Sequence, residues 1–377
     1  MKHVEGLRAL AAYVVFVNHA YAQVWNPGRA QAPPRLLSPF AYSLVAGHLS
    51  VTVFIVISGF CLTIPVVAGA DRLRGGAGDF FKRRARRILP PYYGAVALSL
   101  LLIRTIIGTA TGTLWDVPIR VSTASLVSHL LLLQDLFGTG AINYVFWSIA
   151  VEWQIYFLFP TLVWSWRRYG PTATVLCALA LGYAARLALA GTRVERACPH
   201  YLGLFALGML AAYLARSPSP GYARARARWP WAWGALAGVA ATCALTGAWG
   251  WQTARARSYV LDLAMGASAM CVLVLTTRSS GLLTRLLSWR PLVFIGTFSY
   301  SVYLIHAPLL QVIWQYVLWP WRLGSVSMFA ALMGPGALVV LAASYAFFRV
   351  FEEPFLRKSS VRAAGAIEVV QAQPPTT

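Results

Sequence analysis

The sequence has few acidic residues and almost no lysine. Of its 377 residues, 11 are Asp or Glu and 32 are Lys or Arg, which gives a formal net charge of +21. Charged residues make up only 11% of the chain and hydrophobic residues 58%, whereas a soluble domain carries about 25% charged residues. The mean hydropathy is +0.62. This composition excludes an ordinary soluble domain and indicates an integral membrane protein with many spans.

Cysteine is also scarce, and its spacing forms no motif. The five cysteines are Cys61, Cys177, Cys198, Cys243 and Cys271. None belongs to a C-x-x-C pair and four lie in apolar runs, so we expect neither a disulfide framework nor a metal site. The nucleophile motif G-x-S-x-G is missing as well, so no serine hydrolase of that type is indicated.

Long apolar runs, by contrast, recur from one end of the chain to the other. Runs of about 17–25 residues are typical of membrane-spanning helices. Ten candidates cover residues 8–24, 42–68, 88–108, 145–166, 172–190, 200–215, 231–250, 258–277, 293–318 and 328–351. The second and ninth are long enough to tilt or break, and the sixth is short. We expect an all-α polytopic membrane protein of about ten transmembrane helices in one bundle over residues 1–357, followed by a disordered cytoplasmic tail over 358–377.

The basic residues predict how the bundle is oriented. With the N-terminus inside, the inside segments hold 20 Lys or Arg residues and the outside loops hold 8, as the positive-inside rule requires. We therefore expect a multi-pass protein of the inner or plasma membrane with both termini cytoplasmic, and no nucleic-acid partner. An A-x-A pattern at residues 20–22 resembles a signal-peptidase site. We expect the first helix to be retained, because it carries Glu5, Arg8 and His19.

Two connections between spans have unusual composition. Residues 125–137 are apolar but too short to span, which favours a re-entrant or interfacial helix. Residues 80–93, FFKRRARRILPPYY, place five cations in the loop that enters the third span; they are Lys82, Arg83, Arg84, Arg86 and Arg87. This run is either a positive-inside stop signal or an anion clamp, because arginine binds phosphate through parallel N–H bonds.

Polar side chains inside the apolar runs are candidate functional residues, because each is costly to bury in a bilayer. They are Arg8, His19, His48, Ser58, Glu152, Arg186, Asp262, His306 and Arg349. Arg8 and His19 are eleven residues apart, which is three helical turns plus about 20°, so they share one helix face. His19 and Glu152 lie at matching depth, about 8–11 Å below the outer surface, which allows a His–carboxylate pair. A membrane histidine can also simply satisfy an interhelical hydrogen bond.

These residue types suit acyl transfer from coenzyme A to a hydroxyl group. Arginines on the cytoplasmic side would bind the phosphates of the donor. A histidine with an ordinary pKa of about 6.5 would accept the proton of the acceptor hydroxyl. Glu152 would orient the ring of His19 and stabilise its protonated form. No covalent enzyme intermediate is required.

Six short motifs then occur in order along the chain. They are Arg8 with His19, FIVISGF (54–60), KRRARR (82–87), FWSIAVEWQIYFLFP (146–160), FSYSVYLIHAP (298–308) and FEEPFLR (351–357). In this order they resemble the membrane-bound acyltransferase family 3, whose members O-acylate sugars, polysaccharides and antibiotics. The likeness covers roughly residues 3–357. Each motif alone is weak, but six in order are specific.

The resemblance implies a role for each matched residue. His19 would be the catalytic base, with Arg8 and Glu152 as catalytic partners, and acyl-CoA, by default acetyl-CoA, would be the donor. The donor-binding residues would be Arg83, Arg84, Arg86, Arg87, Ser58, Tyr303 and His306. The acceptor would be a hydroxyl-bearing glycan or a glycosylated, macrolide-type small molecule. The sequence departs from the family pattern in three places: Glu5 replaces the usual Asp, Trp153 replaces a usual second Glu beside Glu152, and Ser50 stands where a Gly is common, with His48 added nearby.

Two other functions remain open. A polytopic transporter or flippase of a glycan or lipid-linked substrate would also contain buried charges, together with inverted repeats and broken helices. The sequence offers one such break, GPG at 334–336, and no convincing partner for it. A structural or lipid-binding protein would use the basic loops alone and would tolerate substitution of His19 and Glu152. The series of motifs favours the acyltransferase.

Overall fold

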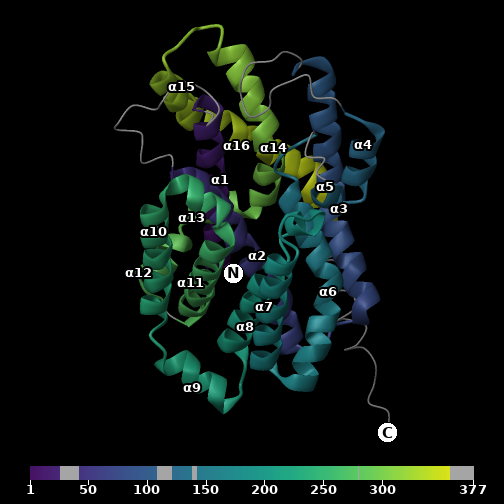
Figure 1. Cartoon of the computed structure of the whole chain (residues 1–377), viewed down its shortest axis with the longest axis vertical. Helices are drawn as coiled ribbons and strands as arrows, with labels where there is room; N and C mark the ends of the chain where they lie inside the picture. The colour runs from purple at the N-terminus through teal and green to yellow at the C-terminus, as the bar shows by residue number, and fades with distance from the viewer. Residues whose placement is uncertain (26–41, 108–120, 138–141, 279, 357–377) are drawn as a thin grey trace.

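The chain folds into a bundle of helices (Figure 1). The computed structural model describes residues 1–25, 42–107, 121–137, 142–278 and 280–356. Within these ranges there is no strand, and eight segments are long and apolar enough to cross a membrane. The expected all-α polytopic membrane fold is therefore confirmed. The expected tail over 358–377 lies outside the described residues.

The expected spans coincide with helices. The eight apolar segments are Leu44–Ala68, Gly76–Thr105, Pro171–Ala188, Arg193–Arg216, Trp231–Ala256, Ser258–Arg278, Ser299–Leu318 and Ser325–Leu356. The other two expected spans correspond to α1 (Lys2–Val24) and α6 (Trp147–Tyr169), of 23 residues each. Each is about 34 Å long, enough for a bilayer core of about 30 Å. Their more polar composition keeps them out of the apolar set.

Helix α2 (Ser43–Ala68) connects the parts of the bundle. It packs against α1, α8 (Tyr201–Arg216) and α11 (Ser258–Arg278). Small residues let transmembrane backbones approach closely, and here a Cβ atom on Gly208 of α8 would collide with the backbone of α2 at Val56. The chain between α6 and α13 also forms α7 (Pro171–Ala188), η2 (Arg193–Ala197), α9 (Pro220–Arg228), α10 (Trp231–Ala256) and α12 (Leu282–Leu287).

The basic run 82–87 lies in a helix, so its expected place in a loop was wrong. Helix α3 runs from Gly76 to Thr105 and includes the whole run as well as Pro90 and Pro91. Lysine and arginine are good helix formers, so the helix begins well before the apolar part of the span. Residues three apart lie on the same helix face, and the helical phase therefore decides which arginines point into the bundle.

The ninth expected span is broken and the tenth is continuous. The break falls at Phe298, between α13 (Arg290–Thr297) and α14 (Ser299–Val312). Helix α14 continues into η3 (Ile313–Leu318). The last span consists of α15 (Ser325–Ala331), η4 (Leu332–Gly336), α16 (Ala337–Phe347) and η5 (Phe348–Glu352). The GPG sequence forms a π-turn there and keeps helical dihedral angles at its ends, so the break expected at 334–336 was wrong.

The apolar segment 125–137 forms two short helices beside the bundle. They are α4 (Thr123–Leu130) and α5 (Gln134–Phe137). Neither is long enough to span a bilayer. Gln154 of α6 donates hydrogen bonds to both carboxylate oxygens of Asp135, each at 3.0 Å, so α5 is fastened to the spanning helix that carries Glu152.

Candidate active site

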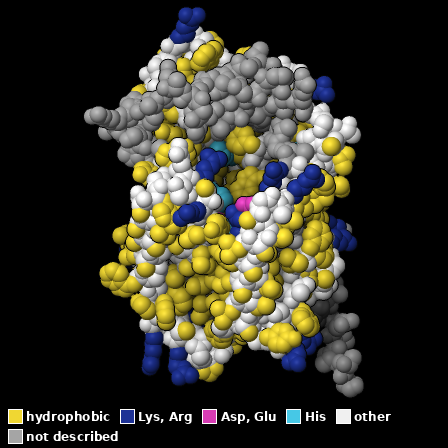
Figure 2. All heavy atoms as spheres, viewed as in Figure 1, with side chains coloured by type: hydrophobic (Ala, Val, Ile, Leu, Met, Phe, Trp, Pro, Cys, Tyr) yellow, Lys and Arg dark blue, Asp and Glu magenta, His cyan; other side chains and the backbone are white. Residues whose placement is uncertain are grey.

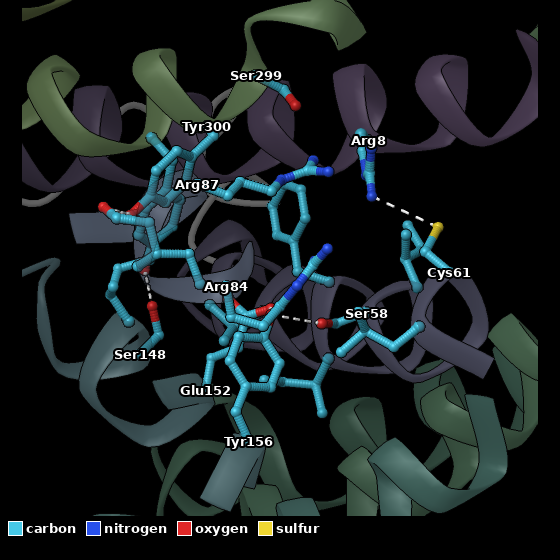
Figure 3. A pocket seen from close by; sticks show the side chains of 18 of the residues that line it. Arg8, Ser58, Cys61, Arg84, Arg87, Ser148, Glu152, Tyr156, Ser299 and Tyr300 are labelled. Atoms are coloured by element: carbon cyan, nitrogen blue, oxygen red, sulfur yellow. Dashed lines mark hydrogen bonds between the residues drawn. The ribbon is translucent and has the colours of Figure 1, made fainter. Parts of the chain in front are cut away.

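A cavity of about 200 Å³ lies between α1, α2, α3, α6 and the break between α13 and α14 (Figure 3). It brings together six of the residues predicted from the sequence, namely Arg8, Ser58, Arg84, Arg87, Glu152 and Tyr303. They come from five helices that are far apart in the sequence. The cavity is therefore assembled only in the folded bundle.

Three arginines converge on this cavity, and two of them are unpaired. Figure 3 shows the guanidinium groups of Arg8, Arg84 and Arg87 pointing into one space. Arg8 donates to the carboxylate of Glu5 at 3.1 and 3.2 Å. Neither Arg84 nor Arg87 forms a hydrogen bond or salt bridge with any described residue, and Nε of Arg84 is buried without a partner. The carboxylates of Glu152 and Glu352 line the same cavity but form no hydrogen bond with these two arginines. The N–H groups of the two arginines therefore remain available to an anionic ligand.

A hydrogen-bonded chain forms the wall at Ser58. The hydroxyl of Tyr156 donates to Oε1 of Glu152 at 2.5 Å. It also lies 2.8 Å from Oγ of Ser58, which can donate to it. This arrangement gives each of these three side chains a hydrogen-bond partner. Glu152 therefore faces the cavity as a hydrogen-bonded carboxylate.

His19 does not line the cavity but pairs with a second histidine. Its Nδ1 atom lies 2.7 Å from Nε2 of His306, and the two rings stack with centroids 5.0 Å apart. Nδ1 of His306 donates to the carbonyl oxygens of Val302 and Tyr303, at 3.0 and 2.8 Å. Nε2 of His306 must then be an acceptor, so Nδ1 of His19 donates to it. This leaves the lone pair of His19 Nε2 available to accept a proton.

The expected pairing of His19 with Glu152 is not found. Among the described residues Glu152 has no hydrogen bond to His19, and its bonded partner is Tyr156. Two residues at the same depth in the bundle form a pair only when their helices turn the right faces toward each other, and depth does not determine this. Helix α1 packs against α14, and this brings His306 to His19. The orienting group is an imidazole that backbone carbonyls hold in one tautomer.

The structure also separates the members of the basic run. Arg84 and Arg87 line the cavity, whereas Arg83 and Arg86 do not. Arg83 donates to the carbonyl oxygen of Arg74 at 2.8 Å, and Arg86 is exposed. The run KRRARR contains two pairs of arginines three residues apart, Arg83 with Arg86 and Arg84 with Arg87, and the second pair lines the cavity.

Sequence reasoning missed several polar residues of the cavity, among them Glu352 and Tyr156. Glu352 lines it and accepts a hydrogen bond from Ser301 at 2.6 Å. It belongs to the FEEPFLR motif, where a carboxylate at the end of an apolar run was an available signal. Tyr156 lies one helical turn after Glu152, on the same face, and could have been found in that way.

A second polar cluster lies where α2, α8 and α11 begin. The carboxylate of Asp262 is completely buried, and its Oδ2 atom accepts hydrogen bonds from Nε2 of His48 and Nε2 of His200, both at 3.0 Å. Thr52 donates to Oδ1. His48 and Asp262 were candidates from the sequence. His200 was missed because it stands at the edge of the short sixth span, where a polar residue is ordinary.

Comparison with known proteins gives one family and distant relatives. A family model described as an acyltransferase domain matches residues 1–349. Peptidoglycan O-acetyltransferase OatA of Listeria monocytogenes is 22% identical over 352 residues, which are 81% of this chain and 49% of that protein. Nodulation protein 10 of Rhizobium leguminosarum bv. viciae is 26% identical over 184 residues, 46% of this chain and 47% of that protein. The chain thus spans about half the length of these relatives. No solved structure matches it.

Proposed function

We propose, because the chain belongs to the acyltransferase family that covers residues 1–349, that it transfers an acetyl group from acetyl-CoA to a hydroxyl group of a glycan. A relative that covers most of this chain is named a peptidoglycan O-acetyltransferase, which supports a sugar hydroxyl as acceptor and acetyl as the group moved. The observation that carries the proposal is the orientation of His19, whose free Nε2 atom is that of a general base.

The donor would bind in the cavity with its phosphates at Arg84 and Arg87. Arginine forms bidentate hydrogen bonds with phosphate oxygens, and these two guanidinium groups have no partner among the described residues. With the orientation expected from the positive-inside rule, this end of the bundle would face the cytoplasm, where the donor would be available. Arg8, already paired with Glu5, would contact the same ligand from the opposite wall.

Nε2 of His19 would take the proton of the acceptor hydroxyl as its oxygen attacks the thioester carbonyl carbon. A new C–O bond forms, the C–S bond breaks, and the proton passes from the imidazolium to the coenzyme A thiolate. The reaction therefore balances without a covalent enzyme intermediate. The bond from Nδ1 of His19 to Nε2 of His306 becomes charge-assisted when His19 is protonated, so His306 stabilises the transient cation.

Purified protein in lipid nanodiscs with radiolabelled acetyl-CoA tests this proposal. The acceptor probe is methyl N-acetyl-β-D-glucosaminide, with label in the glycoside as the readout. His19→Ala should abolish transfer, whereas His3→Gln, at the far end of α1, should leave it unchanged. Labelled product from the His19→Ala protein would refute the assignment. Uptake of the glycoside into proteoliposomes without any donor would instead support a transporter.

A further inference from the structure

The cluster of His48, Asp262 and His200 has no part in the mechanism above, yet one of its histidines reaches the surface. His48 keeps 23% of its side-chain surface, whereas Asp262 keeps none and His200 keeps 3%. A buried carboxylate that receives two N–H bonds and a hydroxyl bond is fully satisfied. Structural support alone does not need the exposed nitrogen of His48.

The hydrogen bonds determine what His48 presents. Its Nε2 atom carries the hydrogen that Asp262 accepts, so in the neutral ring Nδ1 bears a lone pair. No described residue bonds to Nδ1 of His48, and this atom is not sealed inside the protein. His200 differs, because its own Nδ1 atom is buried without a partner. His48 is thus an oriented imidazole with an outward-facing acceptor atom.

His48 and His19 each follow a residue at which α1 and α2 touch. Helices α1 and α2 touch at Asn18 and Gly47, the residues directly before the two histidines, where a Cβ atom on Gly47 would collide with the side chain of Asn18. The charge of Arg255, an exposed residue of α10, acts on both imidazoles. Figure 2 shows a hollow on one face of the bundle in which histidine and basic side chains are visible. Both His19 and His48 keep exposed surface. Nε2 of His19 and Nδ1 of His48 can therefore both contact a ligand bound in this region.

We propose that this region is the acceptor site and that Nδ1 of His48 accepts a hydrogen bond from a second hydroxyl of a carbohydrate while His19 takes the proton of the first. This inference rests on the proposed function and identifies His48 as a residue that selects the acceptor of the proposed reaction. A ligand with two hydroxyl groups a few ångströms apart fits two imidazole acceptors, and a sugar has this chemistry. The ring of Trp147 lies parallel to that of His48, at 7° with centroids 5.9 Å apart, and adds an apolar face against which a pyranose can pack.

Deoxy analogues of one glycoside test this directly. The probes are methyl N-acetyl-β-D-glucosaminide and its 3-, 4- and 6-deoxy forms, with acetyl-CoA as donor. In the unmodified protein one analogue should lose transfer because the reacting hydroxyl is missing. A second analogue should show an acceptor KM raised at least ten-fold, because a site built around a hydroxyl discriminates against its loss.

Substitutions then assign the second hydroxyl to His48. His48→Phe keeps the aromatic ring but removes both nitrogens. It should raise the acceptor KM for the parent glycoside at least ten-fold, abolish the discrimination against the second analogue and change the acetyl-CoA KM by less than two-fold. His48→Gln, which offers an amide oxygen, should recover part of the discrimination. His200→Gln perturbs the same carboxylate, that of Asp262, from its buried side. It should raise the acceptor KM less than His48→Phe does.

The possible outcomes separate this inference from the proposed function. Undiminished discrimination in His48→Phe, or an equal effect of His200→Gln, overturns the role of His48. If the unmodified protein transfers no acetyl group, the proposed function fails, and calorimetric titration of the same glycosides without donor still decides the acceptor site. Binding that His48→Phe weakens at least ten-fold supports it. Equal binding in both proteins, or none to the unmodified protein, overturns it.

Discussion

His19 Nδ1 lies 2.7 Å from His306 Nε2, and the backbone carbonyls of α14 fix the direction of that hydrogen bond. Two helices separated by nearly the whole sequence thus hold the imidazole of His19 in one orientation, as the proposed general base requires. Because His306 is 1% exposed, water does not compete for its Nε2 atom. In this pair an imidazole stands where a carboxylate–histidine dyad would have a carboxylate, so the partner of His19 carries no negative charge.

Replacement of His306 should therefore act on kcat. His306→Phe removes the acceptor for His19 Nδ1 and leaves the base free to rotate or change tautomer. We expect kcat to fall about 10²–10⁴-fold, the range that a positioned general base contributes, with little change in the KM for acetyl-CoA. His306→Asn, whose amide oxygen can accept the same bond, should recover part of the loss. A fall in donor affinity with unchanged kcat would contradict this role.

Substitutions in the two arginine pairs of the basic run should have different effects on the KM for acetyl-CoA. Arg84→Ala and Arg87→Ala each remove a guanidinium group from the cavity wall. A hydrogen bond to a charged group contributes about 1.5–3 kcal/mol, so the KM for acetyl-CoA should rise about ten- to hundred-fold in steady-state assays. Arg83→Ala and Arg86→Ala serve as matched controls on the same helix and should change it less than three-fold. Equal effects in both pairs would show that the run acts through its total charge.

The sequence predicts where the helices lie and which residues share a helix face, but not which faces of two helices meet. Apolar length located the eight segments that are long and apolar enough to cross a membrane, because burying backbone in lipid demands long apolar helices. The other two expected spans coincide with α1 and α6. The position of His19 along its helix could also be read from the sequence. The partner of His19 could not be read from the sequence, because it depends on how α1 and α14 are rotated against each other. The sequence also allowed both Arg83 with Arg86 and Arg84 with Arg87. The choice between these pairs depends on how the helix that begins at Gly76 is rotated in the bundle.

Close packing of α2 against α8 should depend on Gly208. A methyl group there would collide with the backbone at Val56, and overpacking of this kind costs about 1–3 kcal/mol. Gly208→Ala should lower the unfolding temperature of the purified protein by several degrees. Gly247→Ala on α10 is the matched control, because a Cβ atom there meets nothing within 4 Å. It should raise stability slightly, since alanine is the better helix former. Destabilisation of both variants alike would exclude the packing explanation.

The buried carboxylate on α5 should make stability depend on pH. Burial raises the pKa of Asp135 above its usual value, although the hydrogen bonds from Gln154 oppose the shift. The folded state then binds more protons than the unfolded state between the usual and the raised pKa, so the free energy of unfolding falls as pH rises through that interval. Asp135→Asn removes the charge and keeps an acceptor oxygen for Gln154. In thermal unfolding scans this variant should melt above the unmodified protein at pH 8, and the difference should vanish near pH 4. A variant that melts lower at pH 8 would mean that the ionised carboxylate stabilises α5 on α6.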